Sequence, residues 1–140
     1  MLVAFLLYLA ATQPIPFSHR VHAQAKLSCI TCHIGKGRQM GFPSTSLCMG
    51  CHRTVASDKP AIRKLAAARR PIGWERIYEL PEFVWFSHAR HKRAPCSTCH
   101  GEVARRDELQ VEIQMDMKFC RACHLKTGAR AKCGTCHEEK

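Results

Sequence analysis

The sequence predicts a mostly irregular chain of short α-helices, arranged as two tandem modules with little or no sheet. Its 140 residues include ten cysteines, and these fall into five copies of one short pattern. A six-residue phrase with two histidines occurs twice, and large apolar residues are sparse after the first dozen positions. A chain this short with so few apolar residues buries too little side-chain surface to be comfortably stable. We therefore expect a core supplied by something other than side chains.

The five copies of the pattern Cys-x-x-Cys-His account for every cysteine in the sequence. This is the attachment motif of c-type haem, in which two thiols bind one porphyrin and the histidine is the proximal iron ligand. Zinc sites do not need a histidine after each cysteine pair, and thioredoxin-like motifs come singly. We therefore predict five covalently bound haem c groups. The predicted attachment residues are Cys29, Cys32, Cys48, Cys51, Cys96, Cys99, Cys120, Cys123, Cys133 and Cys136. The predicted proximal ligands are His33, His52, His100, His124 and His137.

The four other histidines lie in the duplicated phrase Phe-Ser-His-x-x-His, which occurs at 17–22 and again at 86–91. The two intervening residues are Arg-Val in the first copy and Ala-Arg in the second. Histidines three residues apart share one face of a helical turn, so each copy can serve two neighbouring irons. The alternative is four surface histidines, which leaves the duplication unexplained. The predicted distal ligands are His19, His22, His88 and His91.

One axial position is left over, because five irons need ten ligands and the sequence has nine histidines. Met117, three residues before Cys120, is the predicted tenth ligand, with Met115, Met40 and Met49 as further candidates. A gap-filling role in packing is the alternative for any methionine. A methionine ligand raises the potential of its haem above histidine-ligated neighbours, which suits an exit for electrons.

Four segments follow from this pattern. Residues 1–12 contain an apolar run shorter than the roughly 20 residues of a spanning helix, and we expect a truncated signal peptide or membrane anchor there. Residues 13–53 form a dihaem module, 54–83 a linker, and 84–140 a trihaem module. Within the linker we expect a basic helix capped by Asp58, closed by Arg69 and Arg70 and ended by Pro71.

The formal net charge of +11 has an internal explanation. Five haems would bring about ten negative propionate charges, which nearly cancel the excess. The sequence contains no nucleic-acid module, and we expect no nucleic-acid partner. Seven basic and two acidic residues lie between Arg53 and Arg76. They predict either a docking face for an acidic partner or membrane surface, or a solvated face that balances propionates.

The duplicated phrase ahead of the haem motifs resembles class III multihaem cytochromes, the c3 and c7 group. Longer stretches are similar to the pentahaem cytochrome c subunit of alternative complex III, a quinol-oxidising complex. The most recognisable stretches are 13–19, 43–52, 74–88 and 99–101. The resemblance as a whole covers nearly all of residues 13–137. The family's subunit has an N-terminal membrane helix, and its segment after the first haem is longer than Gly35–Phe42 here.

The resemblance implies electron transport in a respiratory chain, at the periplasmic side of the inner membrane, by an anchored or secreted protein. Partner membrane subunits would oxidise quinol, and this chain would relay electrons to a cytochrome c or terminal oxidase. The family's methionine before its fourth haem motif matches Met117. We expect no catalytic residues in this chain. The alternatives are a free-standing periplasmic c7-type shuttle and a small multihaem reductase with one open haem.

Overall fold

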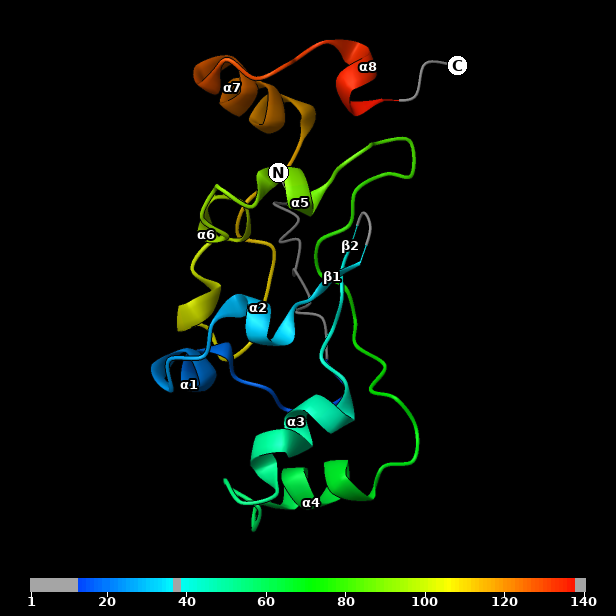
Figure 1. Ribbon diagram of the computed structural model, residues 1–140, viewed down its shortest axis with the longest axis vertical. Coiled ribbons are helices and arrows are strands. Elements are labelled where there is room, and N and C mark those ends of the chain that lie inside the picture. Colours follow the sequence, from blue (N-terminus) through cyan, green and yellow to red (C-terminus); the bar gives the residue numbers. More distant parts are fainter. Residues whose placement is uncertain (1–12, 37–38, 138–140) are drawn as a thin grey trace, which may run out of the picture.

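The computed structural model describes residues 13–36 and 39–137, so the predicted signal or anchor at 1–12 lies outside the described residues. The molecule is elongated, with its helices following one another along the long axis (Figure 1). The helices are α1 (His19–Gln24), α2 (Cys29–Cys32), α3 (Thr45–His52), α4 (Pro60–Ala67), α5 (His88–His91), α6 (Ser97–His100), the 3-10 turn η1 (Val103–Arg105), α7 (Met117–Thr127) and α8 (Cys133–Cys136).

Strand pairing is minimal in the described ranges. β1 (Gly35–Lys36) pairs antiparallel with β2 (Gln39–Met40), and Val84 forms an isolated bridge with His137. The predicted fold class, mostly irregular with short helices and essentially no sheet, is confirmed. Among the described residues, no helix has both the length and the apolar character required to span a membrane.

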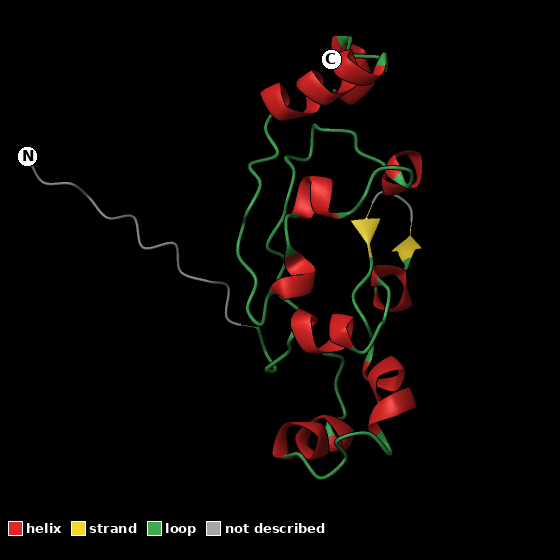
Figure 2. Ribbon diagram, turned by 90° about the vertical axis from the view of Figure 1, so that its left-hand side faces the viewer, coloured by secondary structure: helices red, strands yellow, loops and turns green. Residues whose placement is uncertain are grey.

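The order of the helices along the long axis differs from their order in the sequence. α4 and α3 form one end, α2 and α1 come next, α6 and α5 follow, and α7 and α8 form the other end. Two views at right angles about this axis, Figures 1 and 2, agree on that order. The first half of the described chain passes from α2 to the end formed by α3 and α4. The second half returns along the axis and leads to the other end, formed by α7 and α8.

A polar clamp joins α1 to η1 and so connects the two halves of the chain. The backbone N–H of Arg20 donates to the Arg106 carbonyl at 2.9 Å. The Arg20 guanidinium lies 2.6 Å from the Asp107 carboxylate, and the Ser18 hydroxyl donates to the same carboxylate at 2.5 Å. Hydrogen bonds between charged groups hold their geometry better than neutral ones. The clamp thus fixes where α1 lies relative to the second half.

The prediction for the linker helix was wrong at both of its ends. Residues that precede proline favour extended backbone, so Lys59 before Pro60 becomes the N-cap and Asp58 lies one residue too early. The Asp58 carbonyl accepts a hydrogen bond from the Arg63 guanidinium at 2.7 Å. The helix ends at Ala67, short of the two predicted closing arginines, because Ala68 already has extended backbone.

Side chains alone form almost no core in the described part of the chain. Leu65 of α4, 5% exposed, is the one buried apolar side chain there, and α4 packs against α3. Large apolar side chains near the cysteine motifs remain exposed, with Ile30 at 71% and Leu125 at 65%. A thin layer of polypeptide with this burial pattern fits the expectation that another group supplies the interior.

Candidate functional site

The duplicated phrase folds twice into the same cluster of three rings. Ser18 caps α1, and the Phe17 ring lies edge-on to His19 at 4.8 Å and stacks on His22 at 4.4 Å. In the second copy, the Phe86 ring lies 4.7 Å from His88 and 4.5 Å from His91 in the same two orientations. Phenylalanine in both copies therefore holds two histidines apart and fixes the direction of each ring.

Backbone carbonyls orient several of these imidazoles. A ring N–H that donates to a carbonyl fixes the tautomer and leaves the other nitrogen for a metal. In five histidines, Nδ1 donates to a backbone carbonyl oxygen. The pairs are His22 with Ser18 at 2.8 Å, His91 with Ser87 at 2.9 Å, His33 with Gly41 at 3.0 Å, His52 with Val55 at 2.9 Å, and His124 with Arg130 at 2.5 Å.

Four pairs of imidazoles face each other across a similar gap. Each pair joins one histidine of the duplicated phrase to one motif histidine. The ring centroids lie 6.3 Å apart in His19–His33, 6.0 Å in His22–His52, 6.4 Å in His88–His100 and 6.0 Å in His91–His124. Two imidazoles that bind one metal ion from opposite sides, each at about 2 Å, place their centroids roughly 6 Å apart. The spacing therefore fits an iron between the two members of each pair.

Two of the paired histidines are held in the neutral form. Burial, with added effects from the nearby His33 and His22, lowers the pKa of His19 to about 4. Burial also lowers the pKa of His100, with added effects from His88 and His33. Neutral imidazole is the form that binds metals, so both residues are ready to ligate at neutral pH.

Each Cys-x-x-Cys segment is a helical turn, so its two thiols lie on one face of that turn. All ten cysteines lie in the described residues, and none of them forms a disulfide. We number the sites by the order of their motifs in the sequence: the first holds Cys29, Cys32 and His33, and the fifth holds Cys133, Cys136 and His137. Paired thiols beside a histidine are the attachment set of haem c, and an opposed histidine can supply the second iron ligand.

Electrostatic effects between cysteines of different motifs indicate which sites are neighbours. Burial and the approach of another motif's thiol raise the pKa of a cysteine in each of these pairs. The pairs are Cys32 with Cys51, Cys96 with Cys29 (a hydrogen bond), Cys99 with Cys123, and Cys120 with Cys136. They link the second site to the first, the first to the third, the third to the fourth, and the fourth to the fifth. The helices that carry the motifs follow one another along the long axis in the same order (Figure 1).

The third site has a brace that the sequence did not reveal. The Tyr78 ring lies edge-on to His100 at 5.0 Å, and its hydroxyl accepts from the Glu112 backbone N–H at 2.8 Å. The Glu112 carboxylate accepts from the Glu102 N–H at 2.9 Å and from the Arg106 guanidinium at 2.6 Å. Nothing in the local sequence marks these contacts, since Tyr78 and Glu112 are 34 residues apart.

Gly101 lets the chain turn tightly after the third motif. Its backbone, at φ 73° and ψ −158°, is in a region that essentially only glycine adopts, and an added Cβ would overlap the Glu112 side chain. We expect Gly101→Ala to lower the free energy of unfolding of the haem-loaded chain by about 1–3 kcal/mol. Gly50→Ala is the matched control, because its Cβ meets nothing within 4 Å and alanine favours helix. Equal thermal stability of the two variants would contradict this role of Gly101.

The fifth site differs from the other four. The four pairs use eight of the nine histidines and leave His137, whose ring stacks on Phe83 at 5.7 Å. The Trp85 backbone N–H donates to the Cys136 carbonyl at 2.6 Å, which holds the segment before α5 against α8. Met117 begins α7, 62% exposed. Its role as the tenth ligand stays a prediction.

The C-terminal part of the chain matches a known family. The model of the family "Cytochrome c7 and related cytochrome c" matches residues 84–140. Residues 84–140 are therefore similar to the cytochrome c7 family. The likeness to class III multihaem cytochromes is thereby confirmed, and covalent haem c is the cofactor of this chain.

A curated relative extends the likeness to nearly the whole chain. The chain is 32% identical, over 142 residues that cover 96% of it, to the "menaquinone reductase, multiheme cytochrome c subunit" of Nitratidesulfovibrio vulgaris. The chain spans 62% of that relative's length. The likeness is thus to a multihaem cytochrome c, whereas the function, the haem number and the complex of this chain need separate arguments.

The structure brings together the predicted distal and proximal histidines but adds residues that the sequence reasoning missed. The phenylalanine two residues before the first histidine of each phrase is repeated, and that repetition was the one available signal for its packing role. Two of the carbonyls that orient the rings belong to the serine of the repeated phrase, and the other three come from a glycine, a valine and an arginine that no sequence pattern marks.

Proposed function

We propose that this chain is a pentahaem electron-transfer subunit of a quinone-linked respiratory complex at the periplasmic side of the inner membrane. The observation that carries the proposal is the set of four opposed imidazole pairs, each beside its own pair of thiols. Five motifs predict five haem c groups. Haem iron supplies reversible one-electron chemistry whose potential depends on axial ligands and burial.

The protein's own residues have three tasks in this proposal. The motif cysteines would hold the cofactors at fixed positions, and the opposed histidines would supply two ligands to each of four irons, which would leave no position there for a substrate. Phe17, Phe86 and the orienting carbonyls keep the imidazoles in place during oxidation and reduction. The contacts between motifs give an order of neighbours, second–first–third–fourth–fifth, along which electrons pass.

Closed coordination supports a carrier rather than an enzyme. Four sites each have two histidines, and no step of bond making is assigned to any residue of this chain. The quinone chemistry belongs to partner subunits. The relative's printed name places it in a menaquinone reductase, and the resemblance to the alternative complex III subunit points to the same class of quinone-linked complex.

The location follows from the chemistry of attachment. Thiol addition to haem takes place after export, which favours the periplasm or an equivalent compartment. Membrane association would come through partner subunits, through an anchor, or both. Electrons would leave to a cytochrome c or terminal oxidase.

The proposal is tested by the haem content and the electron capacity of the mature chain. Intact-mass spectrometry is expected to show five covalently attached haems per chain, and an anaerobic reductive titration to consume five electrons. A mass that corresponds to four or fewer haems in fully matured protein would contradict the pentahaem assignment. Turnover of quinol by the isolated chain would contradict its role as a carrier.

A further inference from the structure

We propose that the end of the molecule formed by α4 and the α3–α4 loop binds the acidic face of a redox protein, which exchanges electrons with the second haem site. This inference rests on the proposed electron-transfer function and adds the entry or exit point and the chemistry of the partner. We call residues 53–70 the basic end.

The position of the second site makes it a terminus. Its motif lies on α3 at one end of the row of motif helices, and the next motif helix along the axis is α2, which carries the first site. α4 packs against α3 on the side that faces away from the other sites (Figure 1). A partner bound at the basic end therefore lies next to the last haem in the row.

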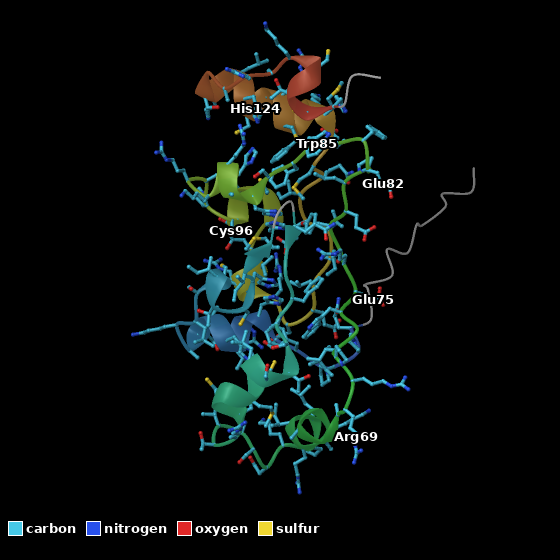
Figure 3. The ribbon with its side chains drawn as sticks, turned by 45° about the vertical axis from the view of Figure 1, so that its right-hand side comes forward. Arg69, Glu75, Glu82, Trp85, Cys96 and His124 are labelled. Carbon is cyan, nitrogen blue, oxygen red and sulfur yellow. The ribbon has the colours of Figure 1, made fainter. Side chains whose placement is uncertain are left out.

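Charge is strongly segregated at this end. Of the eleven acidic residues in the sequence, Asp58 is the one that precedes residue 75. The ion pairs of the described residues belong to Arg20, Arg105 and Arg106, all outside the basic end. Figure 3 shows Arg69 at this end and Glu75 and Glu82 farther along the connecting segment. The exposed basic residues are Arg53, Lys59, Arg63, Lys64, Arg69 and Arg70.

Excess positive charge at a terminus attracts an acidic surface and speeds its association. Complementary potentials steer proteins together and raise association rates by roughly 10–10³-fold at low salt. Val55, 59% exposed in the loop between α3 and α4, adds an apolar contact among the basic residues. An apolar contact ringed by charge is the surface composition of a transient protein interface.

A protein partner fits the basic end better than a lipid surface does. A helix that adsorbs to membranes presents a large apolar face outward, often with tryptophan or phenylalanine. Of the two large apolar residues of α4, Leu65 is buried and Ile62 half-buried, and the sequence from 53 to 73 contains no aromatic residue. The outward side of α4 therefore offers charge without apolar groups that could enter a bilayer.

The test compares two double charge reversals in the full haem-loaded chain. Lys59→Glu/Lys64→Glu changes the basic end, and Lys118→Glu/Lys126→Glu is the control at the other end of the molecule. Each pair places one glutamate near the start and one near the end of a helix, so the effects on helix stability match. Both variants have the same net charge. Stopped-flow measurements follow reduction by reduced flavodoxin, an acidic redox protein, and by the small methyl viologen radical.

We expect the first variant to react about tenfold or more slowly with flavodoxin at low ionic strength, and the control to react at nearly the rate of the unmodified chain. The difference should vanish near 1 M salt, where the Debye length is about 3 Å. An unchanged rate in the first variant, or an equal loss in both, would overturn the proposal. The proposal would also be overturned if the first variant lost binding to phosphatidylglycerol vesicles but kept its rate with flavodoxin, since that result assigns the basic end to membranes.

The methyl viologen arm separates this inference from the proposed function. Every variant should be fully reduced by methyl viologen at a similar rate, because a small mediator needs no docking face. If the unmodified chain is not reduced by methyl viologen, the proposed electron-transfer function fails. If it is reduced and only the flavodoxin comparison fails, the docking inference alone is wrong.

Discussion

Loss of the first haem site is expected to cut the second site off from the other three. In the observed order, the first site is the one link between the second site and the rest, through Cys32–Cys51 on one side and Cys29–Cys96 on the other. Cys29→Ser/Cys32→Ser removes that link, whereas Cys48→Ser/Cys51→Ser removes a terminus and leaves four sites connected. The two variants each keep four haems but differ in how many form one row.

Electrons injected at the far end measure this difference. Lys126→Cys introduces one cysteine on α7 into each variant. Since the remaining motif cysteines are all bound to haem, a ruthenium photosensitiser can be attached to residue 126 alone. We expect three of four haems to be reduced quickly in the variant without the first site and all four in the variant without the second. The isolated haem should be at least about tenfold slower, a rise in activation free energy of about 1.4 kcal/mol or more. If the sites followed one another in sequence order, the two amplitudes would be exchanged.

A second large effect is expected from the distal histidines, because each is tied to one site. The structure pairs His22 with His52 of the second site and His19 with His33 of the first. In a chain that lacks the second haem, through Cys48→Ser/Cys51→Ser, His22→Ala should therefore leave all remaining irons unaffected. In the same background, His19→Ala should convert one of four haems to the high-spin form, since that iron loses one of its two strong-field ligands.

Low-temperature EPR of the oxidised proteins provides this comparison. The high-spin signal should correspond to one haem in the His19→Ala variant and be absent in the His22→Ala variant. The reverse result would show that the pairing is exchanged within α1. A high-spin signal in both variants would show that neither histidine belongs to a single site.

The haem motifs could be predicted from the sequence because their chemistry is local. The spacing Cys-x-x-Cys-His is set by one porphyrin, and the duplicated phrase is set by one helical turn. The pairing of His22 with His52, in contrast, depends on how α1 lies against α3, which is a tertiary relation between residues 30 positions apart. The order of the sites depends on the reversal of the first half of the chain, which no motif encodes.

The same contrast explains the errors in the linker and the omissions at the third site. Proline acts on the residue before it, so Pro60 makes Lys59 the N-cap of α4 in place of Asp58, which composition suggested. Tyr78 and Glu112 support His100 from distant parts of the chain. Gly101 showed its importance only through its backbone angles and its contact with Glu112.

The central claim is that every haem in this chain is coordinatively closed and serves as an electron conduit. It is tested most directly by low-temperature EPR and visible spectra of the oxidised, five-haem protein. We expect low-spin signals alone in the unmodified chain. Because Met117 is the predicted ligand of the fifth iron, Met117→Ala should turn one haem high-spin. A high-spin signal in the unmodified chain that shifts when nitrite or hydroxylamine is added would contradict the account, because it would reveal an open site that binds a substrate.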